Sequence, residues 1–136
     1  MDISTGVAAA PIKLIIAGGR EFDNYKLLLK YITAFQQTHY LTPDLLTIVS
    51  GGARGADKLG ERYAREYGIE FERYIPDWEP NGVFDRTAGF RRNKLMAQNA
   101  THLLAFWDGE SRGTKNMIDT AKRLGLSVDV VYYMRG

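Results

Sequence analysis

The sequence predicts an α/β fold in which strands and helices alternate along the chain. Short apolar runs are typical of strands buried in a parallel sheet, and they occur at residues 12–17, 45–49, 102–107 and 128–133. The first of these runs is rich in β-branched residues. The segments between them carry apolar residues at the helical period. Since parallel strands are joined by right-handed crossovers, this alternation predicts a three-layer domain. Its sheet is mostly parallel and five-stranded, with helices on both faces.

Length and composition narrow the class of protein. A chain of 136 residues with 45% apolar content fits one domain with a sound core, which we assign to residues 12–136. Residues 1–11 lack the features of a signal peptide and are interpreted as a flexible leader. No stretch reaches the roughly 18 apolar residues of a transmembrane helix. We therefore expect a soluble cytoplasmic protein that does not contact the membrane.

Charge, cysteine and histidine content limit the binding chemistry. The 18 basic and 16 acidic residues give a net charge of +2, too small for a general polyanion binder, so any nucleotide or nucleic-acid binding is local. The chain has no cysteine, which excludes a disulfide scaffold and a thiolate metal site. With His39 and His102 as its two histidines, we expect no metal site and no required cofactor.

The first half of the chain contains two strands that each end in glycine. The strand at 12–17 runs into Gly18-Gly19-Arg20, and Asp23 or Asn24 can cap the helix that follows. The strand at 45–49 runs into a glycine-rich segment, SGGARGAD, at residues 50–57, which opens a second helix. Glycines allow close approach, and the free amides of a helix N-terminus attract anions such as phosphate. The spacing excludes both GxxxxGK[ST] and GxGxxG.

The middle of the chain holds an edge strand, a long loop and a basic helix. Residues 70–75 alternate polar and apolar, as in a strand near the edge of a sheet. Residues 77–89 form an irregular loop long enough to carry function, and Trp78 within it is a candidate for stacking on a base. The helix over 90–99 begins within the basic cluster of Arg86, Arg91, Arg92 and Lys94, which oppose its dipole and favour a bound anion.

A third glycine-bearing loop, at residues 108–114, follows the strand at 102–107 and precedes the last helix. In a parallel sheet these loops lie at the same edge, beyond the carboxyl ends of the strands. We therefore predict one phosphate-binding site there. Its residues are Gly18, Gly19, Arg20, Gly51, Gly52, Ala53, Arg54, Gly55, Asp57, Arg91, Arg92, Asn93, Ser111, Arg112, Gly113 and Thr114.

Roles within this site follow from residue chemistry. Backbone amides of residues 51–55 and 112–114 would hold the phosphate, and Arg54 and Arg92 would neutralise it. Asp57 either caps its helix or binds a ribose hydroxyl, and Asn93 orients a base or a loop carbonyl.

Ordered motifs along residues 12–132 resemble a known family. GGRxF, SGGARGAD, Trp78, AGFRRNKLM and FWDGESRGT follow one another as in the YspA-like branch of the SLOG superfamily, which groups the Smf/DprA DNA-processing proteins with the LOG cytokinin-activating enzymes. The resemblance implies a Rossmann-like domain that binds a nucleotide or a nucleic-acid phosphate, as a homodimer. Nucleotide binding is the leading hypothesis, and single-stranded nucleic-acid binding, as in the Smf/DprA proteins, is one alternative.

The other alternative is an enzyme, a nucleoside monophosphate phosphoribohydrolase like the LOG enzymes. The resemblance implies that Gly113-Thr114 and either Arg91 or Arg92 match residues of that active site, but Met117 stands where the glutamate belongs. A thioether neither accepts a proton nor stabilises an oxocarbenium-like sugar. Cleavage would therefore need another acid, for which Glu110 and Asp57 are the candidates, with Arg92 as the candidate cation.

Overall fold

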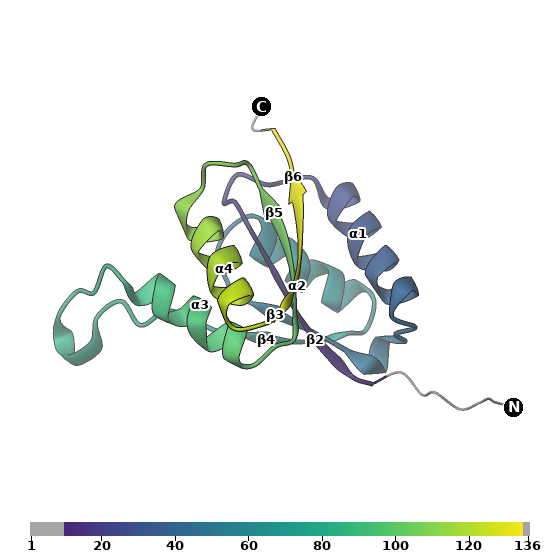
Figure 1. Ribbon diagram of the computed structural model, residues 1–136, viewed down its shortest axis with the longest axis horizontal. Coiled ribbons are helices and arrows are strands. Elements are labelled where there is room, and N and C mark those ends of the chain that lie inside the picture. The colour runs from purple at the N-terminus through teal and green to yellow at the C-terminus, as the bar shows by residue number, and fades with distance from the viewer. Residues whose placement is uncertain (1–9, 135–136) are drawn as a thin grey trace, which may run out of the picture.

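Five parallel strands form one sheet in the order β4-β3-β2-β5-β6, with β2 at its centre. The computed structural model describes residues 10–134 (Figure 1). The predicted five-stranded α/β class is confirmed, and the sheet is parallel throughout. The strands are β2 (Ile12–Gly18), β3 (Leu46–Ser50), β4 (Glu70–Arg73), β5 (His102–Trp107) and β6 (Ser127–Tyr132).

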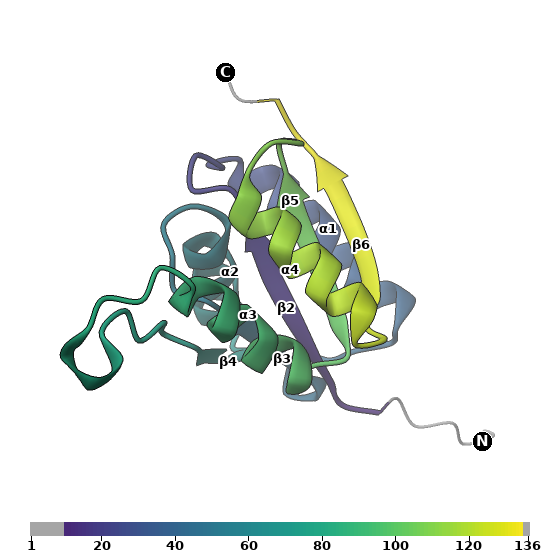
Figure 2. The ribbon, with the colours of Figure 1, turned by 60° about the vertical axis from the view of Figure 1, so that its left-hand side comes forward.

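Two helices cover each face of this sheet, as Figure 2 shows with α3 and α4 in front and α1 and α2 behind. Side chains alternate along β2, so Leu14 and Ile16 join the core beneath α1 and α2, whereas Ile15 and Ala17 join the core beneath α3 and α4. The helices are α1 (Tyr25–Thr38), α2 (Ala56–Glu66), α3 (Ala88–Gln98) and α4 (Arg112–Arg123).

The boundaries differ from the predicted ones by one or two residues, for local reasons. Leu45 belongs to a 3-10 turn, Pro43–Leu45, so β3 begins one residue later than predicted. β4 lies at the edge of the sheet, as predicted, but ends at Arg73 instead of residue 75. Of the two candidate caps for α1, Asn24 is the one used, since its side chain accepts a hydrogen bond of 3.0 Å from the Leu27 amide.

The strand order reverses at β2, because the chain runs outward to β3 and β4 on one side and then crosses to β5 and β6 on the other. In open α/β sheets this reversal leaves a crevice beyond the carboxyl ends of the central strands. The loops after β2, β3 and β5 meet there. The segment before α3, residues 77–87, extends away from the sheet in both ribbon views, and we call it the arm (Figures 1 and 2).

Two predictions from composition concern the N-terminal leader and transmembrane segments. Residues 1–9 of the predicted leader lie outside the described residues. Within residues 10–134, each helix is too short or too polar to cross a lipid bilayer.

Candidate functional site

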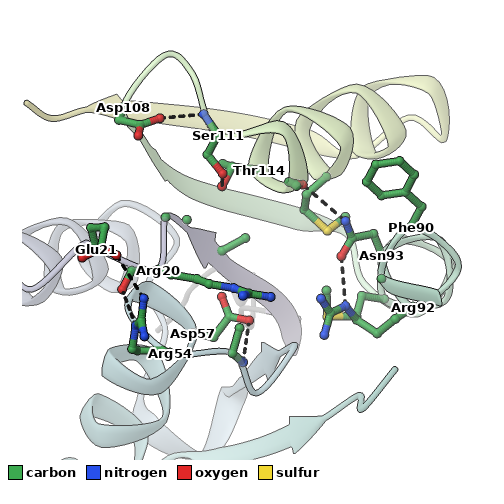
Figure 3. Close-up of a pocket in the computed structure, with 18 of the residues that line it drawn as sticks. Arg20, Glu21, Arg54, Asp57, Phe90, Arg92, Asn93, Asp108, Ser111 and Thr114 are labelled. Carbon is green, nitrogen blue, oxygen red and sulfur yellow. Dashed lines mark hydrogen bonds and ion pairs between the residues drawn. The ribbon is translucent and has the colours of Figure 1, made fainter. Parts of the chain in front are cut away.

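A cleft of about 460 Å³ lies over the carboxyl ends of the central strands (Figure 3). Its walls are the loops after β2, β3 and β5, the first turns of α3, and Trp78 at the base of the arm. The structure brings twelve of the predicted site residues to this cleft: Gly18, Gly19, Arg20, Ala53, Arg54, Asp57, Trp78, Arg92, Asn93, Ser111, Gly113 and Thr114. It leaves out of the lining Gly51, Gly52, Gly55, Arg91, Glu110 and Arg112.

The loop between β3 and α2 is closed by its own hydrogen bonds. The amide of Gly52 donates to the Ser50 hydroxyl at 3.0 Å, and the amide of Ala53 donates to the Asp57 carboxylate at 3.2 Å. The amide of Ala56, in the first turn of α2, donates to the Gly19 carbonyl at 3.4 Å. Of the amides expected to hold a phosphate, those of Gly52 and Ala53 are therefore already bonded to side chains of the protein.

Two glycines of this loop allow close approach by other parts of the protein. Gly55 has a φ of +90°, and a Cβ atom there would lie 2.2 Å from the carbonyl oxygen of Gly19. A Cβ atom on Gly51 would lie 2.6 Å from the Arg92 guanidinium, which donates to the Gly51 carbonyl. Gly55 therefore requires glycine for a contact between two loops, whereas a Cβ atom on Gly51 would displace the end of the Arg92 side chain. Both contacts are made by the protein itself.

Asp57 is the buried acid of the cleft, whose lining also includes Glu21 and Asp108. Its side chain is buried, with 7% of the residue exposed, and burial raises its pKa to about 6 although the Ala53 amide and the Arg92 charge both lower it. Glu110, the other candidate acid, is exposed and lies outside the cleft lining. Met117, at the position of the LOG glutamate, is buried and contributes an apolar surface. An acid poised near neutral pH in a cleft is a common feature of functional sites.

The predicted phosphate-binding arginines occupy different environments. Arg92 is half-buried and donates to two backbone carbonyls, of Gly51 at 2.6 Å and of Tyr74 at 3.3 Å. Arg54 is exposed and bonds Glu21 at 3.0 Å. Arg91 forms an ion pair with Asp85 of the arm, away from the cleft.

Arg20 differs from Arg92, Arg54 and Arg91. Within residues 10–134, its guanidinium forms no hydrogen bond or ion pair, and it extends into the cleft toward Arg92 (Figure 3). Burial lowers the pKa of Arg92, and the neighbouring charge of Arg20 lowers it further. The cleft thus holds two like charges that face each other, and a bound anion would relieve this repulsion.

In the loop between β5 and α4, Asp108 organises a turn, and the start of α4 has no side-chain cap. Asp108 accepts hydrogen bonds from the amides of Glu110 at 2.9 Å and Ser111 at 2.8 Å, which form a tight turn. Ser111 precedes α4 but its side chain does not cap the helix, and its hydroxyl lies 3.2 Å from that of Thr114. The first amides of α4 therefore keep their donor capacity toward the cleft.

Asn93 links the two helices on this face of the sheet. Its side-chain amide donates to Asn116 at 3.0 Å and reaches the Gly113 carbonyl at 3.4 Å. Figure 3 shows Asn93 beside Arg92. The residue is buried, and its carbonyl oxygen accepts from Arg92 at 3.0 Å. These contacts favour the loop-orienting role over contact with a base.

Several residues that line the cleft were not predicted from the sequence as site residues. Ala17, Met96 and Met117 contribute apolar surface to the cleft, and Phe90 contributes an aromatic ring. As apolar residues inside strands and helices they carry no chemical signal that distinguishes them from core. Tyr133 also lines the cleft, and a Cβ atom on Gly19 would lie 2.1 Å from its hydroxyl. Within residues 10–134, acidic and histidine side chains nowhere gather in a group of three that could hold a metal ion.

Comparison with known proteins gives three matches. The model of the YspA, cpYpsA-related SLOG family matches residues 12–80, just over half of the chain. The Gene 61 protein of Mycobacterium phage D29 is 37% identical over 93 residues, which are 64% of this chain and 72% of that protein.

The third match is to a solved structure, that of DNA processing protein A (DprA) from Streptococcus pneumoniae. It is similar over 89% of this chain with a TM-score of 0.69 and 17% identity, so it supports the fold. This chain spans 50% of the length of that structure. Together with the ordered motifs and the parallel sheet, the family match confirms the resemblance: the chain belongs to the YspA, cpYpsA-related SLOG family.

Proposed function

We propose that the protein binds a nucleotide or a nucleotide-derived ligand in this cleft, with a phosphate between Arg20 and the first turn of α4. The observation that carries the proposal is Arg20, a cation in a concave site without a partner among residues 10–134. Across the cleft from it are the Ser111 and Thr114 hydroxyls and the uncapped start of α4 (Figure 3). A guanidinium and a helix N-terminus bind phosphate by complementary means, charge and directed amides.

The rest of the ligand fits the remaining walls. Asp57 supplies an acceptor for a hydroxyl or amino group, and Trp78 with Phe90 supplies an aromatic surface for a base. Trp78 stacks with Phe84 of the arm, with ring centroids 6.2 Å apart and planes 9° apart. A cleft of about 460 Å³ lies within the usual range for small-molecule sites and suits a mononucleotide.

A thermal-shift panel tests the proposal. The panel contains mononucleotides, dinucleotides, ADP-ribose and short single-stranded oligonucleotides, and a ligand at 100 times its Kd stabilises the fold by about 2.7 kcal/mol. Arg20→Gln should weaken binding about 10- to 100-fold, because a charged hydrogen bond contributes about 1.5–3 kcal/mol. Arg91→Gln is the matched control, since Arg91 lies outside the cleft lining and is paired with Asp85. The absence of any shift, or equal shifts in Arg20→Gln and the wild type, would overturn the proposal.

A second candidate function is cleavage of the N-glycosidic bond of the bound nucleotide. It is favoured by Asp57, an acid in the cleft whose pKa is raised to about 6, beside Arg92. Chromatography of each bound nucleotide, after prolonged incubation with the protein, would detect free base. Base release that Asp57→Asn abolishes, while nucleotide binding persists, would support the enzyme. If oligonucleotides bind tightly with a steep salt dependence and mononucleotides do not, the site instead serves single strands.

A further inference from the structure

Glu61 is a fully buried acid that does not contact the cleft. It lies on α2, one turn beyond Asp57, with none of its surface exposed. Its carboxylate accepts a hydrogen bond from the Ser50 hydroxyl at 2.7 Å and two from the Arg73 guanidinium, one of them at 2.9 Å. The Lys58 Nζ atom lies 3.7 Å from Oε1 of Glu61. Burial opposes ionisation, but the bonds from Arg73 and Ser50 hold the pKa of Glu61 below its ordinary value.

Ser50 connects this carboxylate to the loop after β3. Its hydroxyl oxygen accepts the amide of Gly52 at 3.0 Å and lies 3.3 Å from the carbonyl oxygen of Asp57. A serine hydroxyl has one proton, and the shorter contact, to the ionised Glu61, takes it. The lone pairs of the oxygen are thereby turned toward the Gly52 amide. Glu61 thus sets the orientation of the Ser50 hydroxyl, which accepts the Gly52 amide of the loop.

Stability alone is a weak reason for a charge at this position. Glu61 is fully buried although the side chain of its partner Arg73 is 39% exposed. Desolvation of a buried carboxylate offsets much of its attraction to a cation, and apolar residues of the same volume often stabilise a fold as well or better. Another ion pair, Lys13 with Glu72 at 2.7 Å, joins β2 to β4 with both side chains partly exposed, so an ion pair to β4 does not require a buried carboxylate. What burial adds is a fixed geometry at the end of β3, where the loop begins.

We propose that Glu61 is a positioning residue of the cleft: held by Arg73, it fixes Ser50, and through Ser50 it fixes the loop that places Asp57 against the ligand. This inference rests on the proposed function for its binding readout. The orientation of the loop can also be measured without any ligand, which keeps the two proposals separable.

A double-mutant cycle tests the route through Ser50, with adenosine 5′-monophosphate as the probe in titration calorimetry. Glu61→Gln and Ser50→Ala should each raise the Kd about tenfold, and the double variant should also raise it about tenfold, because both act on the same step. Glu72→Gln is the matched control and should leave the Kd unchanged. An additive, roughly hundredfold loss in the double variant would overturn the route through Ser50. An unchanged Kd in Glu61→Gln with a lowered Tm would make Glu61 merely structural.

Amide hydrogen exchange supplies the readout without ligand. In Glu61→Gln the Gly52 amide should exchange at least about tenfold faster. The exchange rate of the Leu28 amide in α1 should change only as far as the global stability of the variant changes. A merely structural role would move both amides together. If wild-type protein binds none of the nucleotides, the proposed function fails, and exchange alone then decides. Selective loss of protection at Gly52 still supports positioning, and equal loss at both amides overturns it.

Discussion

The two loops that flank β2 at the carboxyl edge differ in what occupies them. The loop after β3 contains three glycines, yet its amides at Gly52, Ala53 and Ala56 are bonded to the protein itself. The loop after β5 has fewer glycines, and its helix start is uncapped and faces the cleft. A glycine-rich sequence therefore indicates a close backbone contact, and only the structure tells whether that contact is made by a ligand or by the protein.

Gly55→Ala should have the largest effect on stability, because the added Cβ atom would clash at the contact between the loops after β2 and β3. A Cβ atom would lie 2.2 Å from a backbone oxygen, at a φ of +90° that alanine rarely adopts. Strain and displacement together should lower the free energy of unfolding by about 3 kcal/mol or more. Urea denaturation measures this. A loss below about 1 kcal/mol would show that the two loops are not interlocked as described.

Asp57→Asn should stabilise the protein at neutral pH, by up to about 3 kcal/mol, since the pKa of Asp57 rises from 3.8 to about 6 on folding. The folded state holds the proton more tightly than the unfolded chain. Wild-type stability should therefore fall relative to Asp57→Asn as the pH rises from about 4 to about 6, and the difference should stay constant above that. Denaturation at pH 4 and pH 7 checks the sign. Equal differences at both pH values would contradict the raised pKa.

Thr114→Val should weaken nucleotide binding at the loop after β5 without disturbing the loop after β3. It removes a buried hydroxyl beside Ser111 and keeps the shape of the side chain. Loss of one hydrogen bond to a phosphate is worth about 0.5–1.5 kcal/mol, so the Kd for the nucleotide should rise about 2- to 13-fold. Calorimetric titration measures the change. Thr120→Val, farther along α4, serves as the control and should leave the Kd unchanged.

Gly113→Ala should have the smallest effect, in the opposite direction to Gly55→Ala. A Cβ atom on Gly113 meets open space, and the residue lies in the first turn of α4. Alanine is the better helix former, so the free energy of unfolding should rise by about 0.5–1 kcal/mol. A destabilised variant in the same urea assay would mean that Gly113, like Gly55, is needed for an internal contact.

The sequence was sufficient for the strands, the helices and the edge where the cleft lies, because periodicity and glycine position depend on local residues. It was insufficient for pairings between distant residues. The partnership of Arg54 with Glu21, and that of Arg92 with the Gly51 carbonyl, depend on how loops meet in space. Glu61 was not predicted as a functional residue, because the sequence of an amphipathic helix does not distinguish a buried acid from one on the surface. The homodimer, the cytoplasmic location and the nucleotide ligand stay predictions.

Arg92 helps to set the shape of the cleft in the absence of a ligand. It joins α3 to the end of β3 and to the segment after β4 through carbonyl oxygens, at 2.6 Å and 3.3 Å. These bonds set the distance between two walls without help from the ligand. The site is in this respect preorganised, so binding does not have to order that wall, and less of the interaction free energy is lost to entropy. Replacing Arg92 would then alter the width of the cleft as well as its charge.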